Sequence, residues 1–290
     1  MADSERIPSE SLSRWVEWGT GELAFLGPRE ARRECEVILE DLLGLTRSEL
    51  YLARETNPHN FPRFSEFIQA RKRRVPLAYL LKRAPFWEDV LEVEAGVFTP
   101  RPETEILIES FVKEGGFSPD TAFRFLDLGT GSGAIAVTVA KLFSRARGVA
   151  SDLSEDALAL ALKNAKQLGV TDRIERIQGN GLSVFQAESF DVIFSNPPYI
   201  PSSEREGLEE EVRREPRLAL DGGPEGLDFY HHMMNGLSCL RPGGSLWVEI
   251  GWGQGECVTS LFKRKGFDQI SIFKDLNGIE RVVGASGFHG

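Results

Sequence analysis

The sequence predicts an α/β fold, in which helices cover both faces of a mostly parallel β-sheet. Beyond residue 122, short apolar segments alternate with segments whose apolar residues recur at helical spacing. Such alternation is typical of a parallel sheet, because each crossover between parallel strands carries a helix. A glycine-rich turn, residues 129–133, follows the first of these strands, and Asp152 ends the second. The residues ahead of this region read as helical and predict a separate small domain.

This amino-terminal domain is expected to span residues 1–82. Apolar residues recur at helical spacing ahead of Gly44, which is suited to end a helix. Thr46 and Glu49 have the spacing of a capping box, in which each side chain accepts a hydrogen bond from the other residue's backbone N–H. A later helix is expected to end in the basic run at 71–74, where cations offset the helix dipole.

Residues 83–100 are expected to form a linker with short strands, and residues 101–290 the second domain. Pro102 suits the first turn of a helix over 103–113. The strands of the sheet are expected at residues 123–128, 148–152, 174–179, 190–195, 245–250, 269–273 and 281–283. Two of the helices between them are expected at 132–143 and at 154–168, the second with Ser154 as N-cap and Gly169 at its end. A third helix follows the polar stretch 202–224 and is expected to end at about Leu240. A fourth follows the strand at 245–250 and is expected to end at about Lys265.

Composition excludes several classes of protein. The net charge of -10 and the pI near 5.1 argue against a broad phosphate-binding surface, so no stable nucleic-acid binding is expected. No apolar run reaches the roughly 18 residues that a membrane span needs, so no membrane partner is expected. The start, Met1 to Arg6, lacks the order of a secretory signal, so a cytoplasmic location is expected.

No metal site is expected from the sequence. The three cysteines, Cys35, Cys239 and Cys257, lie far apart and show no Cys-x-x-Cys spacing, so reduced thiols are expected. His231 and His232 lie within a helical pattern, where adjacent residues do not share a face.

The glycine-rich turn predicts a nucleotide-like ligand. Residues 125–134, Phe-Leu-Asp-Leu-Gly-Thr-Gly-Ser-Gly-Ala, run from a strand into a turn that opens a helix. Glycines let backbone N–H groups approach a ligand closely, and the helix N-terminus adds a positive dipole end. Asp152 can accept hydrogen bonds from both ribose hydroxyls, and residues 180–181 are expected to face the same crevice. Asp127 can equally cap the turn, and the turn alone also fits a dinucleotide oxidoreductase.

The stretch Ser-Asn-Pro-Pro-Tyr-Ile-Pro at 195–201 predicts a site for an amino group on a planar system. Pro197 and Pro198 hold the backbone stiff and leave carbonyl oxygens without local partners. Asn196 Oδ1 and the Pro197 carbonyl can therefore accept two hydrogens from one NH2 group, while Tyr199 offers a flat face for stacking. Such a nitrogen is a poor nucleophile because its lone pair is delocalised, so polarising its N–H bonds is useful chemistry.

These motifs resemble class I S-adenosylmethionine-dependent methyltransferases, in which Asp-Leu-Gly-x-Gly-x-Gly binds the cofactor and Asn-Pro-Pro-Tyr holds an amino-type target. Segments 98–105, 195–200, 215–223, 226–230 and 274–281 further resemble the PrmC/HemK family of peptide chain release factor glutamine methyltransferases, over nearly the whole chain. The resemblance implies a Rossmann-like, mostly parallel seven-stranded sheet with a small helical domain ahead of it. It also implies N5-methylation of the glutamine in the Gly-Gly-Gln motif of release factors, converting S-adenosyl-L-methionine to S-adenosyl-L-homocysteine.

The resemblance also carries site residues onto this sequence. The expected catalytic residues are Asn196, Pro197 and Tyr199. The substrate-binding residues are expected to be these three with Pro198, Phe98 and Arg101, the last two forming a wall of the glutamine pocket. The cofactor-binding residues are expected to be Asp127, Gly129, Thr130, Gly131, Ser132, Gly133, Asp152, Asn180, Gly181 and Asn196. Two residues depart from the family pattern: Asn180 stands where Asp is common, and Lys82 stands where Gly is usual.

The expected partners are release factors, with the helical domain as a docking surface and the chain as a monomer. One alternative is methylation of an exocyclic amine of adenine or guanine in RNA or DNA, because Asn-Pro-Pro-Tyr also suits a flipped base. The acidic pI counts against that alternative. A cofactor-binding regulatory protein or scaffold is a second alternative, which cofactor turnover would exclude.

Overall fold

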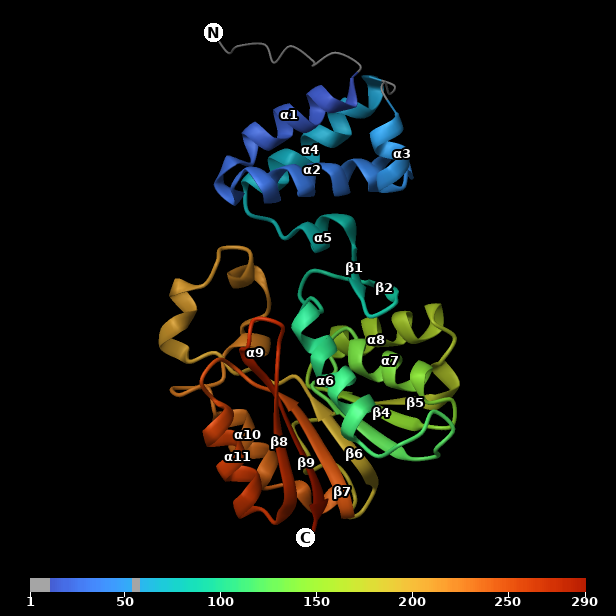
Figure 1. Cartoon of the computed structure of the whole chain (residues 1–290), viewed down its shortest axis with the longest axis vertical. Helices are drawn as coiled ribbons and strands as arrows, with labels where there is room; N and C mark the ends of the chain where they lie inside the picture. Colours follow the sequence, from blue (N-terminus) through green and yellow to red (C-terminus); the bar gives the residue numbers. More distant parts are fainter. Residues whose placement is uncertain (1–10, 54–57) are drawn as a thin grey trace. The chain divides into compact units, whose positions relative to one another are not determined.

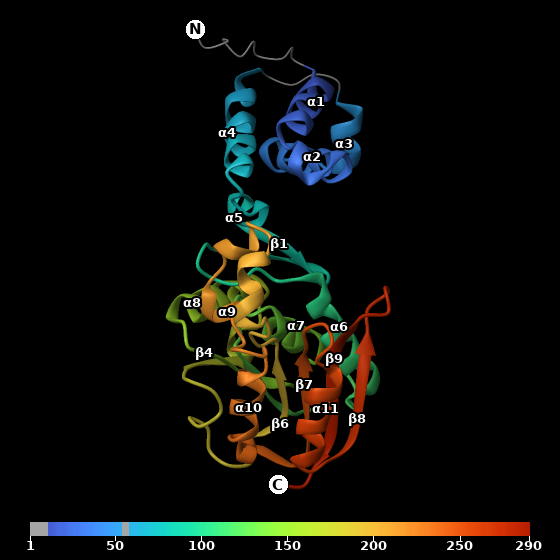
Figure 2. The ribbon, with the colours of Figure 1, turned by 90° about the vertical axis from the view of Figure 1, so that its left-hand side faces the viewer.

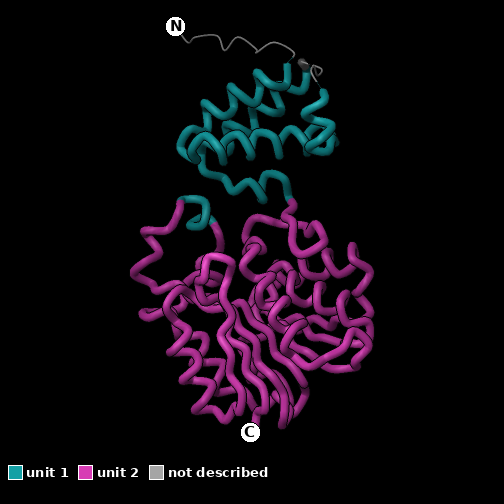
Figure 3. Tube along the Cα trace, in the orientation of Figure 1, with its two compact units in different colours: residues 1–82, 210–214 teal, residues 83–209, 215–290 magenta. Residues whose placement is uncertain are grey.

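The structure is a computed structural model that describes residues 11–53 and 58–290 and divides into two compact units (Figure 3). Unit 1 comprises Met1–Lys82 and Glu210–Arg214, and unit 2 comprises Arg83–Glu209 and Glu215–Gly290. The start of the chain, on which the expected absence of a secretory signal rests, lies outside the described residues. Within the described ranges, no helix combines the length and the apolarity that crossing a membrane would require.

Unit 1 is a helical bundle, as the sequence predicts (Figure 1). Its α-helices are α1 (Leu12–Glu22), α2 (Pro28–Leu43), α3 (Arg47–Leu52), α4 (Phe61–Lys72) and α5 (Leu77–Leu81). Trp15 on α1, Cys35 on α2 and Phe64 on α4 are fully buried in its core. Gly44 ends α2 in the left-handed region, and Thr46 and Glu49 form the predicted capping box at the start of α3.

The basic run at 71–74 contains a buried ion pair, which the sequence analysis did not foresee. The Arg71 side chain is 3 % exposed, and its guanidinium donates to both carboxylate oxygens of Glu34, at 2.6 and 2.9 Å. Arg74 donates to Glu211 Oε1 at 3.0 Å, and Arg71 lies 3.4 Å from the same oxygen. These contacts explain why residues 210–214, far along the chain, belong to unit 1.

The predicted linker contains a small antiparallel hairpin in unit 2, formed by β1 (Arg83–Phe86) and β2 (Asp89–Glu92). Lys82, which ends α5 just before it, has φ of +56°, in the left-handed region. A side chain costs about 1–2 kcal/mol in that region, whereas glycine adopts it freely. The departure from the family's usual glycine therefore falls at a position with a backbone requirement.

The seven-stranded sheet of unit 2 confirms the predicted fold class. Its order is β5-β4-β3-β6-β7-β9-β8, in which neighbouring strands are parallel except that β9 is antiparallel to both of its neighbours. The strands are β3 (Arg124–Leu128), β4 (Arg147–Asp152), β5 (Ile174–Gln178), β6 (Phe190–Ser195), β7 (Leu240–Glu249), β8 (Phe267–Lys274) and β9 (Glu280–Phe288). All seven predicted strands are present, and β7 and β9 extend further than predicted.

Helices cover both faces of this sheet. Successive strand residues point to opposite sides, so adjacent residues of one strand pack against different helices. Phe125 of β3 packs with α6 (Pro102–Glu114), α7 (Ala134–Leu142) and α8 (Glu155–Gln167). Leu126 packs on the other face with α10 (Asp228–Met234) and α11 (Gly255–Arg264). Figures 1 and 2 show α10 and α11 on the side of the sheet opposite to α6 and α7.

The connection between β6 and β7 differs in part from the prediction. A helix was expected up to about Leu240, but α10 ends at Met234 and a short 3-10 helix, Leu237–Cys239, follows. Leu240 already pairs with Phe190 in the sheet, so strand pairing overrides the helical pattern there. The polar stretch over 202–224 carries the short helix α9 (Arg217–Leu220) and further 3-10 turns.

Candidate active site

The carboxyl ends of β3, β4, β5 and β6 meet at one edge of the sheet, because these strands are parallel neighbours. The glycine-rich turn follows β3, Asp152 ends β4, residues 180–181 follow β5, and Asn196 follows β6. The topology therefore brings together the predicted cofactor and substrate motifs, as the open-sheet rule requires.

The turn after β3 is fixed by hydrogen bonds to the end of β4. Gly131 has φ of +53°, and its N–H donates to Asp152 Oδ2 at 2.9 Å. The Ser154 N–H donates to Asp152 Oδ1 at 2.9 Å, so each carboxylate oxygen keeps a lone pair for a ligand hydroxyl. Apart from the glycine itself and its two chain neighbours, no described heavy atom lies within 4 Å of the position that a Cβ would take at Gly129 or Gly131. A ligand can therefore approach the backbone of this turn closely.

The glycine-rich turn also packs tightly on its outer side. A Cβ at Gly133, which has φ of +82°, would lie 2.9 Å from Ala161 Cβ on α8. The Ser132 carbonyl accepts a hydrogen bond from Asn164 Nδ2 at 2.9 Å, and both side chains are buried. These contacts hold the turn rigidly between β3 and the two helices.

Asp127 caps this turn and also keeps an oxygen without a partner. Its Oδ2 accepts hydrogen bonds from Thr130 Oγ1 at 2.6 Å and from the Ala136 N–H at 3.0 Å. Its Oδ1 is buried and has no hydrogen-bond partner among the described residues. Burial raises the pKa of Asp127 to about 7, while the hydrogen bonds from Thr130 and Ala136 limit the rise.

Asn196 leaves two acceptors available at the same edge. Its Nδ2 donates to Thr104 Oγ1 at 2.9 Å. Among the residues that the structure describes, no hydrogen bond is found to Asn196 Oδ1 or to the Pro197 carbonyl oxygen. This arrangement matches the pair of acceptors that the sequence predicts for an NH2 group.

Thr104 and Glu249 are site residues that the sequence analysis missed. The Thr104 hydroxyl donates to Glu249 Oε2 at 2.6 Å, and the Tyr199 hydroxyl donates to Glu249 Oε1 at 3.0 Å. Burial raises the pKa of Glu249 to about 7, and burial together with the adjacent Glu249 carboxylate raises that of Tyr199. A signal was present, because Glu249 is the only charged residue in the apolar run 246–250, at the carboxyl end of β7 beside β6.

Arg101 and Phe98, the predicted pocket wall, lie together. The Arg101 guanidinium carbon is 5.1 Å from the centre of the Phe98 ring, and Arg101 Nη2 donates to Glu215 Oε2 at 2.8 Å. Burial raises the pKa of Glu215, and the charge of Arg101 and hydrogen bonds from Thr99 and Arg101 partly offset this rise. The structure therefore links the segment around Arg101 to the motif that begins at Glu215. The role of Phe98 and Arg101 toward a substrate stays a prediction.

Residues 180–181 lie beyond β5, with Asn180 exposed and Gly181 buried. Gly181 has φ of +70°, and a Cβ there would lie 2.5 Å from His232 Nε2. His232, from which the sequence predicted no metal site, packs against Gly181. No group of three or more potential metal-ligating side chains occurs among the described residues.

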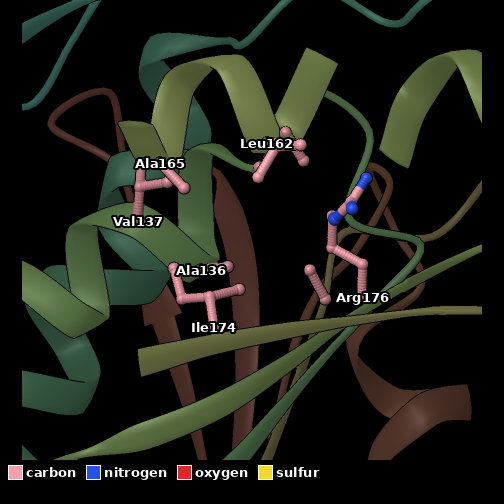
Figure 4. Close-up of a pocket in the computed structure, with 9 residues that line it drawn as sticks. Ala136, Val137, Leu162, Ala165, Ile174 and Arg176 are labelled. Carbon is pink, nitrogen blue, oxygen red and sulfur yellow. The ribbon is translucent and has the colours of Figure 1, made fainter. Parts of the chain in front are cut away.

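A small cavity in unit 2 is not the ligand site. Figure 4 shows it between α7, α8 and β5, beside Ala136, Leu162 and Ile174. Its volume of about 10 Å³ is at the limit for a single water molecule. Ligand pockets of the usual size hold roughly 300–1,000 Å³, so a nucleoside cannot occupy it.

Comparison with known proteins decides the family. Residues 14–81 match the model of the PrmC N-terminal domain, and residues 91–220 match that of the methyltransferase small domain. The chain is 39% identical to the release factor glutamine methyltransferase of Geobacter sulfurreducens over 278 residues, 94% of this chain and 96% of the relative. It is also 39% identical to that of Caulobacter vibrioides, over 86% of this chain and 87% of the relative. The chain belongs to the release factor glutamine methyltransferase family.

A solved structure supports the fold of this family member. The hMettl16 catalytic domain, solved in complex with a MAT2A 3′UTR hairpin, matches with a TM-score of 0.54 over 78% of this chain and 79% of that chain. The sequence identity of 13% limits this likeness to the fold. The class I methyltransferase fold predicted from the sequence is thus confirmed.

Methyltransferases of this class use S-adenosylmethionine, and the residues present fit that cofactor. The open turn at Gly129 and Gly131 gives a nucleoside room to lie against the backbone. Asp152 keeps acceptor capacity for ribose hydroxyls, and the unpartnered Asp127 Oδ1 suits a donor such as an ammonium group. The assignment of individual residues to the cofactor remains a prediction.

We expect Asp152→Asn to weaken S-adenosylmethionine binding about 10- to 100-fold, because hydrogen bonds to charged groups contribute roughly 1.5–3 kcal/mol. The substitution also replaces one acceptor of the Gly131 or Ser154 N–H with a donor. Isothermal titration calorimetry measures the effect, with Asp156→Asn, an exposed carboxylate on α8, as the matched control. A change below twofold in Asp152→Asn would contradict the assignment.

We also expect a pH-dependent loss of stability from Asp127. A carboxyl group whose pKa rises on folding stabilises the fold below its unfolded pKa, near 4, and loses that contribution as pH rises towards the folded value of about 7. Between pH 5 and 7 this loss amounts to about 2 kcal/mol of unfolding free energy. Asp127→Asn should remove this part of the pH dependence. Urea denaturation of both proteins at pH 5 and pH 7, in the absence of cofactor, measures this change in unfolding free energy. An equal change in the wild type and in Asp127→Asn would refute the expectation.

Proposed function

We propose that this protein transfers a methyl group from S-adenosylmethionine to the side-chain amide nitrogen, N5, of the glutamine in the Gly-Gly-Gln motif of peptide chain release factors. The observation that supports it best is the pair of unpaired acceptors on Asn196 and Pro197, beside the glycine-rich turn. An NH2 group on a planar carbon, as in glutamine, matches these acceptors in number and in chemistry.

The proposed mechanism depends on positioning. S-adenosylmethionine supplies a methyl group that is already activated by its positive sulfonium sulfur. Asn196 Oδ1 and the Pro197 carbonyl would hold the two amide hydrogens and turn the nitrogen lone pair toward the bound cofactor. As the N–C bond forms and the methyl–sulfur bond breaks, one of these hydrogens would leave as a proton to solvent. Tyr199 holds the amide plane from one side. Such positioning can supply roughly 7–11 kcal/mol, so neither a metal ion nor a covalent enzyme intermediate is required.

We further propose that unit 1 docks the body of the release factor while unit 2 holds the glutamine. The match of residues 14–81 to a domain model of this family supports a dedicated role for unit 1. The cytoplasmic location and the monomeric state stay predictions.

Mass spectrometry of a release factor incubated with the protein and S-adenosylmethionine tests the proposal. We expect one added methyl group on the Gly-Gly-Gln glutamine and none on a matched release factor that carries Glu at that position. Parallel incubations with RNA and DNA test the alternative substrate. Methyl transfer to a nucleobase without transfer to the release factor would replace the proposal with that alternative.

A further inference from the structure

The Asn196 side chain can work only in one orientation. Its carboxamide has an oxygen that accepts and a nitrogen that donates, and the two ends have nearly the same shape. With Oδ1 toward the substrate, the amide can accept a glutamine N–H. With Nδ2 toward the substrate, it would place a donor against a donor. Some group in the protein must therefore select the orientation.

A chain of hydrogen bonds makes this selection. As a carboxylate, Glu249 has no hydrogen and can only accept. The single Thr104 hydrogen goes to Glu249 Oε2 at 2.6 Å, so the Thr104 oxygen can only accept from Asn196. Asn196 meets that requirement with Nδ2 at 2.9 Å, and its Oδ1 is left for the substrate.

The parts of this chain of hydrogen bonds are held by three different elements. Thr104 lies in the first turn of α6, Glu249 ends β7, and Asn196 follows β6. Thr104 and Glu249 are 4 % and 2 % exposed, so water does not compete for their hydrogen bonds. Glu249 Oε1 also accepts from the Tyr199 hydroxyl at 3.0 Å, which ties both ends of the Asn-Pro-Pro-Tyr motif to one carboxylate.

We propose that Glu249 is a positioning residue that acts through Thr104 to set the direction of the Asn196 amide, and that it orients Tyr199 directly. The inference rests on the proposed function. Neither Glu249 nor Thr104 needs to touch the substrate or the cofactor, and Glu249 lies outside the segments that resemble the family.

The test compares Thr104→Val, which removes the hydroxyl but keeps the shape, with Thr104→Ser, which keeps the hydroxyl. Assays at pH 8.5 keep Glu249 ionised, because its pKa is about 7. We expect Thr104→Val to lower kcat about 10- to 100-fold with KM for S-adenosylmethionine unchanged, and Thr104→Ser to stay within about threefold of wild type. Equal kcat values in the two variants would overturn the proposal.

A second comparison separates positioning from a general loss of structure. In an Asn196→Ala background, Thr104→Val should lower kcat no further, because the group that it positions is gone. A further loss equal to that in the wild-type background would show that Thr104 does not act through Asn196. If Thr104→Val does not fold, Thr104→Ala in the two backgrounds answers the same question, because it also removes the hydroxyl and leaves the Glu249–Tyr199 hydrogen bond in place.

A measurement without turnover keeps this inference separate from the proposed function. Nitrogen-15 NMR observes the Asn196 side-chain NH2 group, which Asn196→Ala assigns by its disappearance. We expect one of its protons to exchange slowly with water in the wild type and in Thr104→Ser, and rapidly in Thr104→Val or Glu249→Gln. Slow exchange in all of these proteins would overturn the inference, whereas absent release factor methylation would overturn only the proposed function.

Discussion

Replacing Asn196 with alanine is expected to lower kcat for release factor methylation about 10²- to 10³-fold. The substitution removes Oδ1, one of two acceptors that hold the glutamine amide, and removal of one positioned hydrogen-bonding group in an active site has effects of this size. The Pro197 carbonyl remains, so the glutamine can still bind, but its amide nitrogen is no longer held in the orientation that the reaction needs. Single-turnover methylation with saturating S-adenosylmethionine measures the chemical step directly.

The affinity for S-adenosylmethionine should change far less than kcat in this variant, because the turn at Gly129 and Gly131 and the carboxylate of Asp152 are untouched. Asn235→Ala, an exposed asparagine at the end of α10, is the matched control and should keep full activity. Equal losses of rate and of cofactor affinity would contradict the role assigned to Asn196.

The second large effect is expected in unit 1, where Arg71→Met should destabilise the helical bundle by about 3–5 kcal/mol. The substitution leaves the Glu34 carboxylate buried without its bidentate partner, and breaking a buried pair from one side has a cost of this size. It also removes a cation beside Glu211. Hydrogen exchange of the α2 and α4 amides in the full-length protein reports the opening free energy of this unit.

Arg73→Met is the matched control, because Arg73 lies at the same helix end but is exposed. It should change the opening free energy by less than about 0.5 kcal/mol, as surface substitutions usually do. Adding Glu34→Leu to Arg71→Met should recover much of the lost stability, since an apolar pair needs no charge compensation. If Arg71→Met and Arg73→Met have equal effects, the buried pair does not stabilise unit 1.

The regular elements of the fold were predictable because their signals are local. The capping box at Thr46 and Glu49 and the N-cap at Ser154 depend on residues three positions apart, and all are present. The error near Leu240 has the opposite origin. That residue joins β7 by pairing with Phe190, a partner 50 positions away that helical periodicity cannot reveal.

The candidate site likewise contains residues that local motifs reveal and residues that only long-range contacts reveal. Asp152 and Asn196 were recognisable because they follow strands within motifs whose order along the chain already implies a shared edge. Thr104 belongs to a segment that sequence reasoning assigned only to helix initiation and to a pocket wall. Its hydroxyl meets Asn196 across 92 positions of the chain, so no local pattern records the contact.

By itself, the sequence determined the α/β fold class, the family and the motifs that meet at one edge of the sheet, because strand and helix periods and short motifs depend on near neighbours along the chain. Only the tertiary structure decided which charges are buried and which partners they have: Arg71 with Glu34, and Glu249 with Thr104 and Tyr199. The physical reason is that burial and hydrogen-bond direction depend on distances in space between residues from different elements, and the chain's order does not specify those distances.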